Sequence, residues 1–180
     1  RHPDPEPSIH PGRRGPSFQS LVTDDSAVET LTNIPVAYRL GPRTLYGPED
    51  GTALFTYNET NGARVFGPGN VSRRPYVKDG FHDHIVHARP TVNPGLEGTK
   101  AGLHYVFDAV PPGGSVVIRL RLSDDSGLAD PLGDVDQMVA RRQAEADEFY
   151  DSIHPRGASA DERRIQRQAF AGLLWTKQNY

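Results

Sequence analysis

Short apolar runs separated by turn-forming residues dominate the chain from about residue 35 to residue 124. These runs are rich in β-branched and aromatic residues, and they read VAYRL, RTLYG, ALFTY, ARVFG, HIVHAR, LHYVFDAV and SVVIRLRL. Glycine, proline, asparagine and aspartate separate them, a spacing that is typical of short strands in an antiparallel sandwich. The pattern therefore predicts a mainly β fold, with part of an antiparallel β-sandwich over residues 35–124.

The clearest alternation of apolar and polar positions lies at residues 115–122. Ile118 and Leu120 would face one side of a strand there, whereas Arg119 and Arg121 would face the other. The run at 103–109 alternates in the same way, and the intervening Pro-Pro-Gly-Gly sequence is a turn signal. We expect 103–109 and 115–122 to pair as a hairpin in the centre of the β domain.

The segment before the β domain has a different composition. Five prolines fall within the first 20 residues, which contain few apolar side chains. Such a composition predicts a loop-rich or disordered lead-in over residues 1–34.

Two amphipathic helices are predicted after the strands, within residues 125–180. A polar linker leads to Asp134, and helical spacing of apolar residues then continues as far as Ile153. A second helix begins at Ser159, which forms a capping box with Glu162. Its apolar stripe consists of Ile165, Ala169, Phe170, Leu173 and Trp175. Strands followed by helices indicate two structural regions and not an alternating α/β fold.

The ends of the chain suggest a fragment of a longer protein. The second helical pattern reaches Tyr180 with little to terminate it, and the only methionine is Met138, so the chain begins without a start residue. We expect the apolar stripe to pack against later helices of the parent protein, or to pair with a second copy as a homodimer.

Composition excludes several classes of partner. The formal net charge is −3 and the isoelectric point is about 6.2, which argues against a nucleic-acid surface. No apolar stretch is long enough to span a bilayer, and the mean hydropathy is −0.60. The absence of cysteine fits a cytoplasmic bacterial protein. We therefore expect no nucleic-acid and no membrane partner.

The densest polar cluster in the sequence is KDGFHDHIVHAR at residues 78–89. If this segment is a strand, His82 and His84 share a face, and His87 points to the opposite one. Two histidines and a carboxylate could hold zinc or iron, but the strand geometry separates the third histidine. On that basis we expect no metal ligand here. A Ser-His-Asp hydrolase is also disfavoured, because no serine lies in a Gly-x-Ser-x-Gly sequence.

Several longer stretches resemble a known family. They are TYNETN (56–61), YVKDGFHDHIVHAR (76–89), VNPGLEGTKAGLHY (92–105), PPGGSVVIRLRLSD (111–124), RRQAEADEFYDSI (141–153) and DERRIQRQAFAGLLWTKQNY (161–180). Together they resemble a group of bacterial glucosidases related to glycoside hydrolase family 63, the processing α-glucosidase family. In those proteins an N-terminal β-sandwich leads into an (α/α)6 barrel. The resemblance covers about residues 40–180.

The resemblance implies an inverting glycoside hydrolase that acts on α-glucosides or related sugars. Such an enzyme needs a general acid and a general base that activates water. In the family both lie on the helical barrel, outside this chain, so no catalytic, cofactor-binding or metal-binding residue is assigned and no cofactor is expected. The implied partners are the carbohydrate substrate and the remaining helical domain. The alternative is a stand-alone β-sandwich module that binds carbohydrate or protein.

Overall fold

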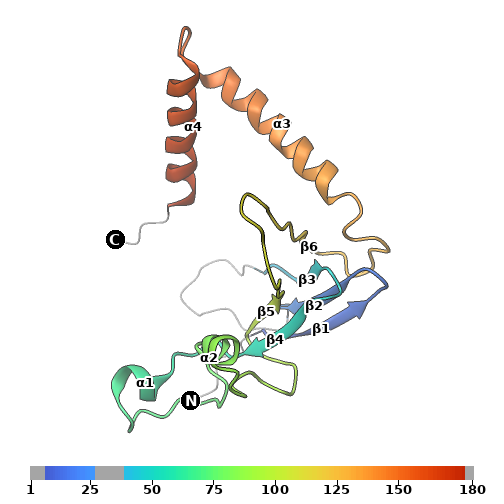
Figure 1. Ribbon diagram of the computed structural model, residues 1–180, viewed down its shortest axis with the longest axis vertical. Coiled ribbons are helices and arrows are strands. Elements are labelled where there is room, and N and C mark those ends of the chain that lie inside the picture. The colour runs from blue at the N-terminus through green and yellow to red at the C-terminus, as the bar shows by residue number, and fades with distance from the viewer. Residues whose placement is uncertain (1–6, 27–38, 177–180) are drawn as a thin grey trace. The chain divides into compact units, whose positions relative to one another are not determined.

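The computed structural model describes residues 7–26 and 39–176 of the chain (Figure 1). The chain divides into two compact units, which meet in sequence between Val135 and Asp136. The first unit contains all the described strands and two short helices, and the second contains a pair of longer helices.

The first unit is built from two antiparallel sheets. The larger sheet has the strand order β1-β2-β3-β6, from β1 (Ile9–Arg14), β2 (Gln19–Asp24), β3 (Pro42–Gly47) and β6 (Arg121–Ser123). The smaller sheet pairs β4 (Thr52–Thr56) with β5 (Lys100–His104). The helices of this unit are α1 (Gly62–Phe66) and α2 (Gly80–His87). Antiparallel sheets followed by two C-terminal helices confirm the predicted fold class.

The core of the first unit is small and lies between its strands. Its buried apolar side chains are Phe18, Leu21, Tyr46, Leu54, Phe55 and Val77. Phe18 and Tyr46 meet edge to face, with ring centroids 5.7 Å apart, a favourable arrangement for aromatic rings. The Tyr46 hydroxyl donates to the Asp125 carbonyl at 2.9 Å. This buried ring therefore satisfies its polar atom while it fills the core.

A close backbone approach joins the two sheets at Gly98. The Ile9 amide donates to the Gly98 carbonyl at 2.7 Å, and the Gly98 amide donates to the Ile9 carbonyl at 3.2 Å. A Cβ atom at residue 98 would lie only 2.2 Å from the carbonyl oxygen of Thr56. Only glycine fits this position without a backbone shift.

The predicted loop-rich lead-in over residues 1–34 is wrong for residues 9–24, which form β1 and β2. The prolines of this segment made it resemble a loop. Pro11, however, lies where the pairing register of β1 shifts before Arg14, and a proline is tolerated at such an irregularity. Burial of Phe18 and Leu21 stabilises the pair. The rest of the predicted lead-in that follows β2 lies mostly outside the described residues.

The predicted hairpin of 103–109 with 115–122 is also wrong. Strand β5 ends at His104 and pairs with β4, whereas β6 begins at Arg121 and pairs with β3. The Pro111–Gly114 turn does form, since the Gly114 amide donates to the Pro111 carbonyl at 2.9 Å. The segments before and after the turn do not pair with each other, because β5 and β6 each pair with a strand that is distant in sequence.

Two of the predicted strand runs are helical. ARVFG contributes to α1, where the Asn61 side chain accepts a hydrogen bond from the Arg64 amide as an N-cap. HIVHAR contributes to α2, which ends at Ala88 in the left-handed conformation with φ 52°. β-Branched residues alone did not distinguish short helices from strands here.

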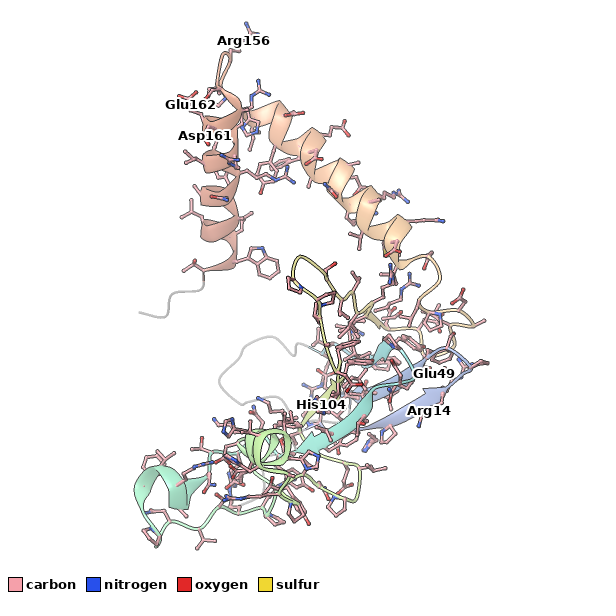
Figure 2. All side chains as sticks on the ribbon, viewed as in Figure 1. Arg14, Glu49, His104, Arg156, Asp161 and Glu162 are labelled. Atoms are coloured by element: carbon pink, nitrogen blue, oxygen red, sulfur yellow. The ribbon has the colours of Figure 1, made fainter. Side chains whose placement is uncertain are left out.

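The second unit contains α3 (Val135–Ile153) and α4 (Ala160–Trp175). The bounds of α3 and the start of α4 were predicted closely. The prediction that the second helix continues to Tyr180 is wrong, because α4 ends at Trp175 and Thr176 is extended; residues 177–180 lie outside the described residues. The capping box of α4 is present, with the Ser159 hydroxyl accepting from the Glu162 amide and the Glu162 carboxylate accepting from the Ser159 amide. Glu162 and its neighbour Asp161 stand in the first turn of α4 (Figure 2). Among the described residues, no helix has the length and apolar character needed to cross a bilayer.

Candidate functional site

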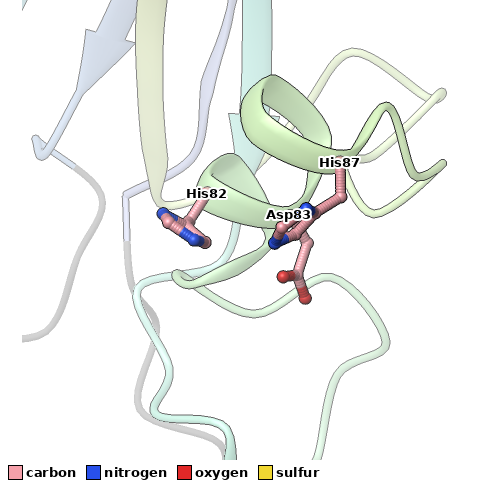
Figure 3. Close-up of side chains that lie close together, drawn as sticks. All are labelled: His82, Asp83 and His87. Carbon is pink, nitrogen blue, oxygen red and sulfur yellow. The ribbon is translucent and has the colours of Figure 1, made fainter.

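A cluster of two histidines and one aspartate occupies one side of α2. His82, Asp83 and His87 each offer one ligand-capable atom, and these atoms all lie within 4.8 Å of one another (Figure 3). The rings of His82 and His87 meet nearly edge to face, with centroids 5.6 Å apart. Both imidazoles are exposed, and Asp83 is partly buried.

Helical geometry explains why the sequence-based view of this segment was wrong. On a strand His87 would face away from His82, but on a helix Asp83 and His87 are separated by four positions and share a face. The expectation that no metal ligand lies here assumed a strand, and this assumption is incorrect because the segment is helical. His84, which the strand placed beside His82, instead has its Nδ1 3.0 Å from the Arg89 carbonyl oxygen.

The remaining described histidines lie elsewhere, and His10 is on β1. His104 is on β5 (Figure 2). His154 follows α3, where its Nδ1 lies 2.5 Å from Oε1 of Gln166. None of these three belongs to the α2 cluster.

An arginine links the cluster to α1. Nη1 of Arg64 lies 2.8 Å from Oδ2 of Asp79 and 3.5 Å from Oδ2 of Asp83. Nδ2 of the Asn61 side chain also donates to Oδ2 of Asp79, at 3.1 Å. Burial alone would raise the pKa of Asp79, but the hydrogen bonds from Arg64 and Asn61 outweigh it and hold this pKa below its ordinary value. Asp79 is therefore the main anion for Arg64.

The other carboxylate oxygen of Asp79 and of Asp83 lacks such partners. Oδ1 of Asp79 and Oδ1 of Asp83 are buried, and neither has a hydrogen-bond partner among the described residues. Buried polar atoms are normally paired, so such an oxygen calls for an explanation. In Asp83 this oxygen belongs to the carboxylate that lies close to both histidines.

A second candidate site is an apolar surface on the helices of the second unit. Large apolar side chains are at least 40% exposed here, and we call them the helical apolar surface: Met138, Val139, Phe149, Ile153, Ile165, Leu173, Leu174 and Trp175. Neither α3 nor α4 contains a buried residue. An exposed apolar surface of this kind is usually covered by another element or partner.

The two helices contact each other mainly near the loop that joins them (Figure 1). The rings of Tyr150 and Phe170 stack with centroids 6.4 Å apart, and the Arg167 guanidinium lies over the Tyr150 ring at 4.8 Å. Arg167 also forms an ion pair with Asp147. These contacts leave most of the apolar stripe uncovered, including Trp175 at 84% exposure.

Sequence reasoning noticed residues of both sites but assigned no metal ligand to the histidines. It identified the histidines of residues 82–87 and the apolar stripe of α4, but it missed the link from Arg64 to Asp79 and Asp83. The spacing of Asp83 and His87 was the available signal, because four residues is one helical turn. Asp79 stands at the N-cap position of α2, although its side chain is engaged by Arg64 and Asn61 and makes no capping bond.

One comparison with known proteins is informative. The chain is 40% identical over 143 residues to the uncharacterized protein YMR196W of Saccharomyces cerevisiae, and the match covers 73% of this chain. It covers only 13% of the yeast protein, so the chain spans a small part of that relative. No protein-family model matches the chain, and no solved structure matches it.

Proposed function

We propose that this chain is the N-terminal accessory part of an inverting glycoside hydrolase that acts on α-glucosides or related sugars. The two catalytic carboxyl groups lie outside it, on a helical domain that the α3–α4 pair introduces. One carboxyl protonates the departing oxygen, and the other activates a water molecule on the opposite face of the sugar. The work of this chain is to support that domain, in the cytoplasm of the cell.

The observation that carries the proposal is the helical apolar surface. Leu173 and Leu174 are each 75% exposed on α4, which is unusual for large apolar residues gathered on one helix. Further helices packed beside α3 and α4, as in the (α/α)6 barrel of the resembled family, would cover it. The length of the yeast relative supports the same proposal, because the match covers only 13% of that protein and the rest lies outside it.

The activity is tested on the full-length protein that contains this chain. We expect it to hydrolyse an α-linked glucoside and to release the β-anomer of glucose first, which proton NMR of the anomeric signals detects. The 180-residue chain alone should give no turnover. Release of the α-anomer would contradict an inverting mechanism. The location of the catalytic groups would be contradicted if the chain alone showed turnover and lost it on mutation of one of its own acids.

The role of the helical apolar surface is tested separately in the same full-length protein. Leu174→Asp should lower the thermal unfolding temperature strongly, whereas Arg164→Asp on the same helix should change it little, because Arg164 is exposed and forms a surface ion pair with Asp161. Equal, small effects would mean that α4 faces water. A full-length protein that binds sugar without hydrolysing it would instead favour the stand-alone binding module.

For the 180-residue chain in isolation we propose that the same surface pairs with a second copy. Hydrogen exchange at residues 163–176 should then slow as the protein concentration rises. Exchange that is independent of concentration would contradict a homodimer through α4.

A further inference from the structure

We propose that His82, Asp83 and His87 form a binding site for one divalent transition-metal ion of zinc-like ligand preference. Two imidazoles and one carboxylate are donors that suit zinc and its first-row neighbours. Three protein ligands leave a further coordination position for water or another small ligand. The site is independent of the glycosidase proposal, because it lies on α2 and uses none of the groups proposed for sugar hydrolysis.

The distances are compatible with a single ion. Zinc–ligand bonds of about 2.0–2.2 Å place the ligand atoms of a tetrahedral ion roughly 3.3–3.6 Å apart. The three ligand-capable atoms already lie within 4.8 Å of one another. His82 and His87 are exposed, so rotation of their side chains can close the remaining difference without any change in the backbone of α2.

Asp83 supplies the second, independent observation. Its Oδ1 is buried and has no hydrogen-bond partner among the described residues. Leaving such an acceptor unpaired is unfavourable, and a cation held between this oxygen and the two imidazoles would satisfy it. The carboxylate is also fixed in position, because its side chain is only 14% exposed and its other oxygen faces Arg64.

Arg64 makes the proposal more specific. Its guanidinium lies 3.5 Å from Oδ2 of Asp83, but it is held more closely by Asp79, at 2.8 Å. A positive charge at this distance opposes the binding of a second cation at Asp83. Replacing Arg64 with an uncharged residue should therefore strengthen metal binding, whereas loss of any ligand should weaken it.

The first experiment titrates the 180-residue chain with Zn²⁺ in competition with a chromophoric chelator, and repeats the titration with Co²⁺ to follow its visible absorption. We expect one saturable site per chain. His82→Ala, Asp83→Asn and His87→Ala should each weaken Zn²⁺ binding by about tenfold or more, since even outer-shell changes at metal sites cost about 10–100-fold. Arg64→Gln should tighten it.

His84→Ala is the matched control, because His84 is on the same helix but its ring faces the Arg89 carbonyl. It should leave Zn²⁺ affinity unchanged. The proposal is overturned if no one-to-one site is found, or if His84→Ala weakens binding as much as His82→Ala does.

A second measurement uses the unaltered chain, so that it stands even if a variant fails to fold. Nitrogen-15 NMR of the histidine rings should show the signals of His82 and His87 shifting on addition of one equivalent of Zn²⁺. The rings of His84 and His104 should not shift at that stoichiometry. Equal shifts in all four rings would mean non-specific surface binding and would overturn the site.

Discussion

The strands of the first unit and the helix pair of the second are stabilised in different ways. In the first unit Tyr46 and Phe55 are fully buried, and strands distant in sequence pair around them. In the second unit no residue of α3 or α4 is buried, and the helices rely on capping, ion pairs and the Tyr150–Phe170 contact. The first unit has an interior of its own, whereas the second consists of well-formed secondary structure without one. The two should therefore respond differently to the same kind of mutation.

The largest difference is expected for removal of an apolar side chain. Phe55→Ala empties a fully buried position of β4 and should lower the free energy of unfolding of the first unit by about 3–5 kcal/mol. Leu173→Ala on α4 removes a side chain that is 75% exposed, so it should change stability by no more than about 0.5 kcal/mol. Urea denaturation followed by circular dichroism measures both, at a protein concentration low enough to keep the chain monomeric. A comparable loss in the two variants would mean that α4 is already covered within the chain.

Substitution of glycine by alanine should have opposite signs in the two units. Gly98→Ala brings a Cβ to within 2.2 Å of the Thr56 carbonyl oxygen, and relief of that overlap should cost about 1–3 kcal/mol. Gly172 lies within α4, and a Cβ there meets nothing within 4 Å. Gly172→Ala should therefore stabilise the helix by up to about 1 kcal/mol, through its higher helix propensity. Thermal unfolding of the two variants measures the sign of each change in stability. Destabilisation by Gly172→Ala would reveal a close neighbour of Gly172.

The same contrast explains which elements the sequence predicted well. Helices α3 and α4 are specified by local signals, namely helical spacing of apolar residues and the Ser159–Glu162 capping box. These signals act within a few residues, so they can be read from sequence without knowledge of distant partners. The bounds of α3 and the start of α4 were accordingly close to those observed, whereas α4 ends at Trp175 and not at the end of the chain as predicted.

The strands depend on long-range pairing, and there the sequence was less informative. β3 pairs with β2 and β6, so residue 45 lies opposite residues 21 and 122. A local turn at Pro111–Gly114 favoured a hairpin, but pairing with distant strands decided the outcome. β1 and β2 were missed because Pro11 in β1, the prolines on either side of that strand and the polar residues resemble a loop, although Phe18 and Leu21 supply the burial that stabilises them.

The histidine cluster was recognised in sequence, but its geometry was not. The residue types were correct, yet their arrangement depends on whether the backbone is a strand or a helix. The contacts of Arg64 with Asp79 and Asp83 join residues 15 and 19 positions apart. No local pattern indicates contacts over that separation.

A smaller effect is expected at the start of α4. Ser159→Ala removes the side chain that accepts from the Glu162 amide and should cost about 1 kcal/mol of helix stability. Ser152→Ala is a matched control within α3, where the hydroxyl donates to the Phe149 carbonyl of its own helix and caps no terminus. Hydrogen exchange of the amides at 160–166 should accelerate only in Ser159→Ala. Equal acceleration in both variants would mean that the capping box does not stabilise α4.

The smallest effect is the pH dependence of the same capping box. The Ser159 backbone amide donates to the Glu162 carboxylate at 2.8 Å and its hydroxyl does so as well, and these bonds lower the pKa of Glu162 below its ordinary value of 4.5. A carboxyl whose pKa is lower in the folded state stabilises that state above its unfolded pKa, and this stabilisation is lost as the pH falls through the lowered value. The first turn of α4 should therefore remain intact from neutral pH down to 4.5 and loosen below it. The Ser159 amide signal in NMR reports this step directly, and Glu162→Gln should remove it while Asp161→Asn leaves it in place. A Ser159 titration at or above 4.5 would show that the carboxylate does not hold the cap in solution, and the helix pair would then rest on its ion pairs and the Tyr150–Phe170 contact alone.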